Sequence, residues 1–250
     1  MKRYFLQISY KGTNYHGWQI QPNAISVQEV IEKTLSTVLR ETIEVVGAGR
    51  TDTGVHASFF VLHFDTEKDI REPENLLYKL NSLLPYDIAC QKIWPVEPDL
   101  HARFSAVSRT YKYYISTQKN PFKTDTSFKY LLALNIDQMN EAARILAEYE
   151  DFTSFSRLHT DVKTNNCKIL WAQWEVVNTQ LIFTIKADRF LRNMVRAIVG
   201  TLLEVGKGKL SLSDFRKIIE AKDRGAAGAS APAKGLFLVN VEYPEGKMGE

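Results

Sequence analysis

The hydrophobic pattern of the first hundred residues changes repeatedly between alternation and helical spacing. Apolar and polar residues alternate from Tyr4 to Tyr10, which predicts a half-buried strand. Ser26 is followed three residues later by Glu29, a capping-box signature, and apolar positions then recur at helical spacing as far as Leu39. The same criteria predict strands over 43–46, 58–64 and 88–94, and a helix over 76–84 that Pro85 ends.

The second half of the chain mixes the same two patterns without repeating the sequence. Strands are predicted over 110–116 and 236–241, and a hairpin over 171–177 and 181–187. Helices are predicted from Asp137 to Leu146, from Phe190 to Val205, and from Ser211 to about Ala221. Because strands come in adjacent pairs as well as between helices, we expect an α+β fold. It would have a mixed, largely antiparallel central sheet flanked by helices, with two similar subdomains, 1–107 and 108–250.

Composition narrows the classes of protein. The chain has 250 residues, 44% hydrophobic and 24% charged, which is typical of a folded globular protein. Its net charge of +3 excludes a histone-like polycation and an acidic tail protein. The two cysteines, Cys90 and Cys167, form neither a disulfide framework nor a CxxC pair. We expect a reduced, cytoplasmic location and no membrane partner, since no apolar leader and no run near ~18 apolar residues occurs.

The small net charge conceals segregation along the chain. Residues 101–123 carry a net charge of +5 and residues 186–209 carry +4, whereas residues 65–99 carry −4. Clustered basic residues of this kind can supply a phosphate-binding, salt-sensitive surface for a nucleic acid.

The segment 47–57 is the strongest candidate for chemistry. Three glycines, Gly47, Gly49 and Gly54, flank Arg50 and Asp52. The spacing fits neither the GxGxxG dinucleotide fingerprint nor the Gly-Lys-Ser/Thr ending of a P-loop. A purely structural role, in which Asp52 bonds its own turn, is an open alternative.

Arg50 and Asp52 are two residues apart, so in an extended segment their side chains point to the same side. A guanidinium beside a carboxylate keeps the carboxylate ionised and can also bind phosphate. An ionised aspartate in a glycine-lined loop is a candidate nucleophile or general base.

The segment 49–57, Gly-Arg-Thr-Asp-Thr-Gly-Val-His-Ala, resembles the active-site motif of the bacterial tRNA pseudouridine synthase A family. Other blocks resemble the motifs of this family in the same order over nearly the whole chain. They comprise 10–19, 26–29, 101–106, 109–113, 151–155, 190–200 and 231–236. One departure is Asn165-Asn166-Cys167, which leaves open the local residue that contacts RNA.

The resemblance implies an isomerase that converts uridine to pseudouridine in tRNA without a metal or cofactor. It makes Asp52 the catalytic aspartate and maps Tyr111 to the aromatic residue that receives the turned-out base. It adds Arg50 and Arg196 as substrate-binding residues. The remaining candidates for RNA contact are His56, Arg103, Lys112 and Arg192. Ordinary packing in a sheet is the alternative for Tyr111, and a charged helix face is the alternative for Arg196.

The resemblance also implies the substrate and the assembly: uridines 38, 39 and 40 of the tRNA anticodon stem-loop, bound by a homodimer. The five histidines, His16, His56, His63, His101 and His159, show no metal-ligand spacing. Two alternatives stay open, a non-catalytic RNA-binding protein on the same scaffold and a paralogue that acts at another tRNA position.

Overall fold

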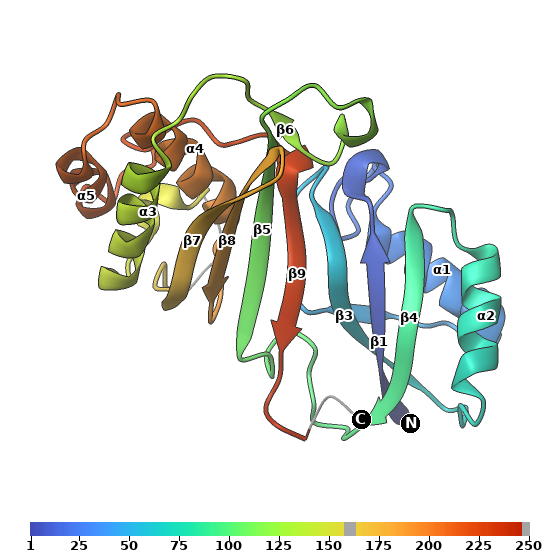
Figure 1. Ribbon diagram of the computed structural model, residues 1–250. Coiled ribbons are helices and arrows are strands. Elements are labelled where there is room, and N and C mark those ends of the chain that lie inside the picture. The colour runs from blue at the N-terminus through green and yellow to red at the C-terminus, as the bar shows by residue number, and fades with distance from the viewer. Residues whose placement is uncertain (158–163, 247–250) are drawn as a thin grey trace. The chain divides into compact units, whose positions relative to one another are not determined.

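The computed structural model describes residues 1–157 and 164–246, and their contacts group into two compact units. Unit 1 comprises residues 1–107 and 238–250, and unit 2 comprises residues 108–237. Helices and strands occur in both units, and almost all of the strand pairs are antiparallel (Figure 1). The predicted α+β class with largely antiparallel strands is confirmed. The predicted subdomains differ from the units at the end of the chain, because residues 238–250 group with unit 1.

Unit 1 is built on an antiparallel sheet with the strand order β4-β1-β3. The strands are β1 (Lys2–Tyr10), β3 (His56–Thr66) and β4 (Ile88–Val96), and the short β2 (Val45–Gly47) pairs with β3. The register places Leu6 of β1 opposite Leu62 and Ile93. All three strands therefore contribute apolar side chains to one core, in which Leu6 and Leu62 are fully buried.

Two helices pack beside each other against the strands of unit 1 (Figure 1). In α1 (Val27–Leu39) the predicted cap is present, because the Ser26 hydroxyl accepts a hydrogen bond from the Glu29 N–H at 3.3 Å. Residues Val27, Ile31, Leu35 and Leu39 form its buried stripe. The second helix, α2 (Pro73–Leu83), begins at a proline, which needs no N–H partner in the first turn.

Unit 2 has the strand order β5-β8-β7, also antiparallel. Its strands are β5 (Ser108–Ser116), β7 (Ile169–Val177) and β8 (Gln180–Ala187), and β6 (Phe128–Lys129) runs parallel to β5. Strands β7 and β8 form the predicted hairpin, with Asn178 in a left-handed conformation at its turn. The last strand, β9 (Leu236–Glu242), begins in unit 2 and ends in unit 1.

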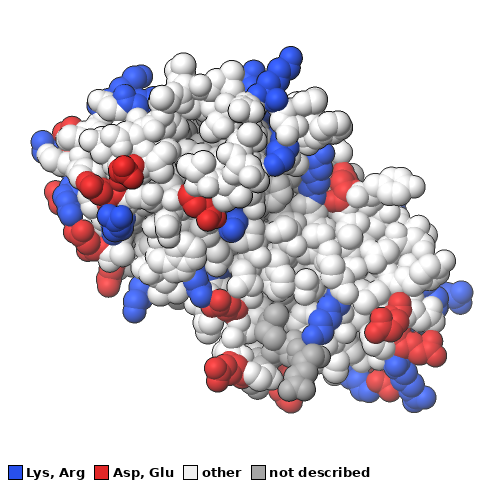
Figure 2. Space-filling view, in the orientation of Figure 1, with Lys and Arg blue, Asp and Glu red and all other residues white. Residues whose placement is uncertain are grey.

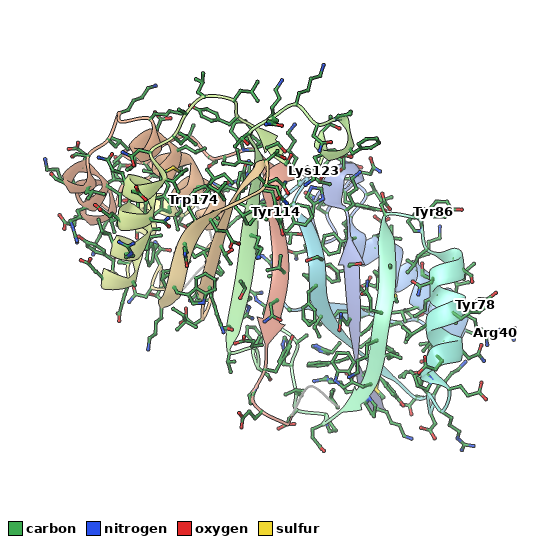
Figure 3. All side chains as sticks on the ribbon, in the orientation of Figure 1. Arg40, Tyr78, Tyr86, Tyr114, Lys123 and Trp174 are labelled. Carbon is green, nitrogen blue, oxygen red and sulfur yellow. The ribbon has the colours of Figure 1, made fainter. Side chains whose placement is uncertain are left out.

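Three helices, α3 (Ile136–Ile145), α4 (Met194–Gly206) and α5 (Leu212–Glu220), complete unit 2. Trp174 of β7 lies beside α3, whose Asn140 side chain exchanges two hydrogen bonds with the Trp174 backbone (Figure 3). The described residues also form five short 3-10 helices: η1 (Gly12–Asn14), η2 (Pro121–Lys123), η3 (Leu146–Glu148), η4 (Thr153–Phe155) and η5 (Ala233–Gly235).

Two predicted helix starts are corrected by the structure. The helix predicted from Phe190 begins at Met194, because Asn193 adopts a left-handed conformation (φ 66°) that interrupts the helical path. The helix predicted to begin with Asp137 is capped two residues earlier, by the Asn135 side chain. None of the helices in the described part of the chain is long and apolar enough to cross a membrane.

Candidate active site

The loop between β2 and β3 carries Asp52, and the segment 10–18 holds this loop through backbone contacts. The Trp18 N–H donates to the Thr51 carbonyl at 3.2 Å, and the Gly54 N–H donates to the Tyr15 carbonyl at 3.3 Å. The Val55 N–H donates to the Asp52 carbonyl at 3.1 Å and closes a turn at the aspartate. Asp52 is thereby presented half-buried on a loop whose backbone is held on both sides.

Glycines make this close approach of two backbones possible. Gly17 has φ +88°, and a Cβ there would lie 2.4 Å from the Thr51 carbonyl oxygen. A Cβ at Gly12 would lie 2.0 Å from the Val55 carbonyl oxygen. The two blocks 10–19 and 49–57, separate in the sequence, are thus one packed assembly in unit 1.

A third segment supports this assembly from outside. The Asp87 carboxylate, which precedes β4, accepts hydrogen bonds from the Tyr15 hydroxyl at 2.6 Å and from the Asn14 amide at 2.9 Å. Burial, followed by the hydrogen bond to Asp87, raises the pKa of the Tyr15 hydroxyl. Tyr15 therefore stays protonated and donates to Asp87 throughout the physiological range.

The structure changes the interpretation of two predicted residues of this loop. Arg50 is exposed, so its guanidinium is accessible to solvent, whereas the spacing alone suggested a place beside the Asp52 carboxylate. His56 is fully buried, and its Nδ1 accepts a hydrogen bond from the Gly12 N–H at 3.0 Å. A buried ring cannot bind RNA, so His56 serves to hold the segment 10–18 against the loop.

Arg103, the remaining candidate in unit 1, lies in the segment between β4 and β5. Its guanidinium is 5.4 Å from the centre of the exposed Phe104 ring, and that ring stacks at 4.4 Å on His101. The His101 Nδ1 accepts hydrogen bonds from the Arg103 and Phe104 N–H groups and holds this turn. Arg103 therefore projects from an ordered turn.

Unit 2 brings Tyr111 and Arg196 to the same face of its sheet. Tyr111 and Tyr113 of β5 point to the same side because they are two residues apart. Arg196 of α4 lies near Tyr113, because the Tyr113 hydroxyl donates to the Pro232 carbonyl and the Arg196 Nε donates to the adjacent Ala231 carbonyl, both at 2.8 Å. The Tyr111 ring packs edge to face on Phe190, with the ring centres 5.1 Å apart. Phe190 is a further candidate that residue type alone does not single out. Its place just before α4, in the same motif as Arg196, is the sequence signal that points to it.

Arg196 is anchored by the segment that follows α5. Its Nε donates to the Ala231 carbonyl at 2.8 Å, and the Ala231 N–H donates to the Arg196 carbonyl at 2.9 Å. The close packing requires Gly200, where a Cβ would lie 1.8 Å from the Ala229 carbonyl oxygen. The motif 231–236 therefore helps to fix the first turn of α4.

The other two candidates of unit 2 differ in their surroundings. Lys112 points to the face of β5 opposite to Tyr111, where its Nζ lies 3.9 Å from a Glu175 carboxylate oxygen. Arg192 is exposed in the turn before α4, and its carbonyl accepts a hydrogen bond from the Arg157 N–H. Lys112 and Tyr111 thus cannot bind RNA through the same face of this strand.

The basic residues of 108–123 and 186–209 meet within unit 2. Strands β5 and β8 pair antiparallel with Thr110 opposite Lys186, and the Arg109 guanidinium donates to the Asp188 carbonyl at 2.9 Å. Elsewhere in this unit the charges are mixed: acidic and basic side chains alternate around α3 and α5 (Figure 2), where Arg216 pairs with Glu148. Arg109 and Lys186, one from each basic segment, therefore lie at the same end of the β5–β8 pair.

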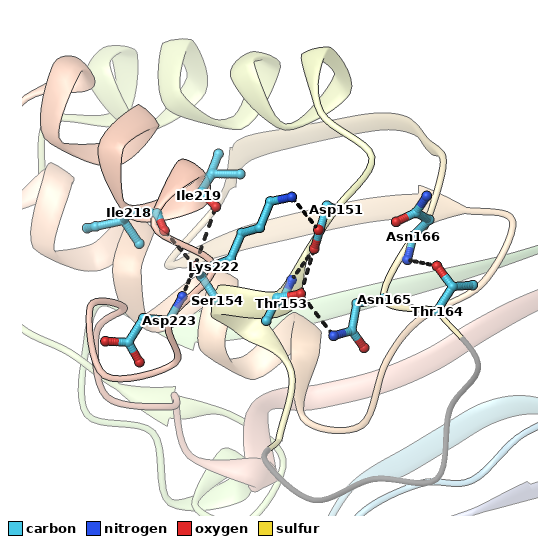
Figure 4. Close-up of polar contacts among 10 residues, drawn as sticks. All are labelled: Asp151, Thr153, Ser154, Thr164, Asn165, Asn166, Ile218, Ile219, Lys222 and Asp223. Atoms are coloured by element: carbon cyan, nitrogen blue, oxygen red, sulfur yellow. Dashed lines mark hydrogen bonds and ion pairs between the residues drawn. The ribbon is translucent and has the colours of Figure 1, made fainter.

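The segment Asn165-Asn166-Cys167, which departs from the motifs of the family it resembles, has a structural role in unit 2 (Figure 4). The Asn165 amide donates to the Thr153 hydroxyl at 2.9 Å, and that hydroxyl donates to Asp151 at 2.6 Å. Asp151 also pairs with Lys222 at 2.9 Å. Burial opposes ionisation, but the hydrogen bonds from Thr153 and Lys222 outweigh it, and the pKa of Asp151 is lowered. Asn165 thus ties two segments of unit 2 together, while Asn166 is exposed.

No group of three or more histidine, cysteine or acidic side chains that could hold a metal occurs among the described residues. His159 lies outside them. Both cysteines are buried as free thiols, and burial raises the pKa of each to about 12. Neither cysteine has the lowered pKa of a reactive thiol.

Comparison with known proteins identifies the family. Residues 7–105 and 142–244 match the family described as tRNA pseudouridine synthase. The chain belongs to this family. It is 60% identical to tRNA pseudouridine synthase A of Bacteroides thetaiotaomicron over 253 aligned positions, which cover 100% of this chain and 94% of that protein. It is 59% identical to the Bacteroides fragilis protein of that name, covering 98% of both.

More distant relatives carry the same name. The chain is 43% identical to tRNA pseudouridine synthase A of Bacillus subtilis, with 94% of this chain and 97% of that protein covered. The two ranges of the family match, 7–105 and 142–244, include the Asp52 loop and the segment that anchors Arg196. The family that the ordered motifs indicated is therefore confirmed.

Proposed function

We propose that this protein isomerises uridine to pseudouridine at positions 38, 39 and 40 of the tRNA anticodon stem-loop, with Asp52 as its single catalytic carboxylate. The observation that carries the proposal is the Asp52 loop, which is held by the glycine-dependent packing of segment 10–18 and presents its carboxylate half-buried. Membership of the tRNA pseudouridine synthase family supplies the reaction class.

In this reaction the N1–C1′ bond of uridine breaks, the uracil turns, and C5 bonds to C1′. The proton leaves C5 and N1 ends protonated, so the product is an isomer and no oxidant or reductant takes part. Glycosidases commonly use a second carboxylic acid to protonate the leaving group. A uracil anion is already stabilised, so one carboxylate suffices, in agreement with the lack of a second acidic residue in the segment 47–57.

Other residues receive roles that match their surroundings. The target base must leave its stack, which costs a few kcal/mol, and Tyr111 offers an aromatic surface to receive it. The Tyr111 hydroxyl group can also take the proton that leaves C5. Arg196 contributes positive charge on the same face as Tyr111. Arg50 is exposed and therefore available to the RNA.

Affinity for tRNA is assigned to the basic residues around the end of the β5–β8 pair, together with Arg103 and Arg192. Contacts of this kind bind phosphate and weaken with salt. The proposal includes a homodimer that acts in the cytoplasm, as the family resemblance implied.

The test uses tRNA labelled with tritium at C5 of uridine, because isomerisation releases this label. The unmodified protein is expected to release label, whereas Asp52→Ala and Asp52→Asn release none above background. Both variants are expected to bind tRNA within about threefold of the unmodified protein, because phosphate contacts dominate the affinity. Mapping the product then determines the modified positions.

Each other outcome has a distinct meaning. Binding without label release by the unmodified protein on any tRNA would support the non-catalytic RNA-binding protein. Release at positions outside the anticodon stem-loop would identify a paralogue with another target. Undiminished release by Asp52→Ala would exclude Asp52 as the catalyst.

A further inference from the structure

A buried hydrogen bond joins the end of β1 to the residue before Asp52. The Tyr10 and Thr51 hydroxyl oxygens are 2.9 Å apart, although these residues are 41 positions apart in the sequence. Tyr10 is only 4% exposed and Thr51 only 8%. Neither hydroxyl group is therefore available to RNA, and their contact acts within unit 1.

Aromatic packing fixes the position of the Tyr10 ring. Its centre lies 5.7 Å from the Phe60 ring and 6.4 Å from the Trp18 ring. Trp18 and Phe60 also pack on each other, at 4.3 Å. Gly47 leaves the room they need, since a Cβ there would lie 2.6 Å from both rings. The hydroxyl group thus projects from a rigid aromatic cluster.

Thr51 is held at its backbone as well as at its side chain. Its carbonyl accepts the Trp18 N–H at 3.2 Å and lies against the Cα of Gly17. The hydrogen bond between its hydroxyl group and that of Tyr10 adds a second attachment, from a different strand. Two attachments at one residue limit the rotation of the peptide unit that leads to Asp52.

We propose that Tyr10 and Thr51 are positioning residues, whose hydroxyl pair sets the direction in which the Asp52 carboxylate enters the site. This inference rests on the proposed function of Asp52. A catalytic group must be held within about 0.5 Å of its productive position by residues that are themselves locked by packing. The Tyr10–Thr51 pair supplies that support, because the aromatic cluster on which it is built does not belong to the loop.

A substitution series can separate positioning from stability. Tyr10→Phe and Thr51→Val each leave one buried hydroxyl group without this partner, which destabilises a protein. The double variant removes both hydroxyl groups and replaces them with apolar groups of similar shape, which is nearly neutral for stability. Positioning, by contrast, is lost in all three variants, because the hydrogen bond is absent from each.

The measurements are the single-turnover rate constant of tritium release, the dissociation constant for tRNA and the melting temperature. Both single variants are expected to release label about 10-fold more slowly, with the dissociation constant within twofold of the unmodified protein. In the double variant, most of the decrease in melting temperature seen in the single variants is expected to be reversed. Its rate of label release is expected to stay about 10-fold lower than that of the unmodified protein. Thr51→Ser, which keeps the hydroxyl group, is expected to retain at least half of the rate.

Tyr78→Phe is the matched control. Tyr78 lies on α2 of the same unit, is 73% exposed and points outward (Figure 3). The Tyr78→Phe variant also loses a tyrosine hydroxyl group, and all three measurements are expected to stay unchanged.

Three results would overturn the inference: single variants within twofold of the normal rate, a double variant whose rate recovers together with its melting temperature, or a Thr51→Ser variant as slow as Thr51→Val. These results differ from a failure of the proposed function, in which the unmodified protein releases no label or Asp52→Ala retains its release.

Discussion

Replacing Gly17 with alanine tests whether the packing of segment 10–18 sets the geometry of the Asp52 loop. The backbone of Gly17 has φ +88°, a conformation that costs a residue with a side chain about 1 kcal/mol. The new Cβ would also lie 2.4 Å from the Thr51 carbonyl oxygen, about 1 Å closer than ordinary contact. Overpacking of this kind costs about 1–3 kcal/mol. We therefore expect Gly17→Ala to lower the free energy of unfolding by about 2–4 kcal/mol.

The contact between the new Cβ and the Thr51 carbonyl predicts that Gly17→Ala lowers the rate of catalysis more than it weakens tRNA binding. To relieve the clash, the Thr51 carbonyl must move by about 1 Å, and Asp52 follows it in the chain. A displacement of this size near a reacting group can lower a rate about 100-fold. Urea denaturation measures the stability, and tritium release under single-turnover conditions measures the rate at a temperature where the variant is folded.

Gly49→Ala is the control for stability, because no atom lies within 4 Å of a Cβ at Gly49. It is expected to change the free energy of unfolding by less than about 0.5 kcal/mol. A Gly17→Ala variant that is destabilised but releases label within threefold of the normal rate would refute the reasoning, because the loop would then tolerate the displacement.

Two further predictions concern other parts of the molecule. Gly200→Ala is expected to lower the stability by about 1–3 kcal/mol in urea denaturation, because its Cβ would lie 1.8 Å from the Ala229 carbonyl oxygen; an unchanged midpoint would contradict this packing. The pKa of His63 is lowered to about 4, chiefly by burial and then by Arg3, whereas the unfolded value is about 6.5. Between pH 6.5 and pH 4 the unfolded chain therefore binds the extra proton, and stability falls as the pH falls, by about 3 kcal/mol from this group. Protonation would also remove the Nδ1 acceptor of the Ala102 N–H. His63→Asn should flatten this part of the stability profile, and a profile parallel to that of the unmodified protein would argue against His63 as its source.

Local patterns predicted the elements of the fold well, and their limits have physical causes. The Ser26 cap and the apolar stripe after it specify α1, because capping and helical periodicity are properties of neighbouring residues. The alternation in β1 and the turn residues around Asn178 specify strands for the same reason. The apolar spacing predicts a start of α4 four residues too early, because it continues through a position where Asn193 leaves the helical path.

The assignment of the site residues stays a prediction, whereas the structure shows the surroundings of each candidate. The ordered motifs selected Asp52, Tyr111 and Arg196, yet residue types alone do not reveal which way a side chain points. His56 is buried, and Lys112 lies on the opposite face from Tyr111. The hydroxyl pair of Tyr10 and Thr51 was not predicted, because it joins residues from two distant segments.

The sequence by itself thus determined the family, the α+β class and the loop that carries Asp52, because these depend on residue identity and on short-range periodicity. The tertiary structure alone decided how that loop is held. The packing of Gly12 and Gly17 against it, the burial of His56 and the support from Tyr10 all depend on strands that meet through long-range pairing. Local alternation gives the relative directions of side chains along a strand, but which of them become buried follows from that pairing.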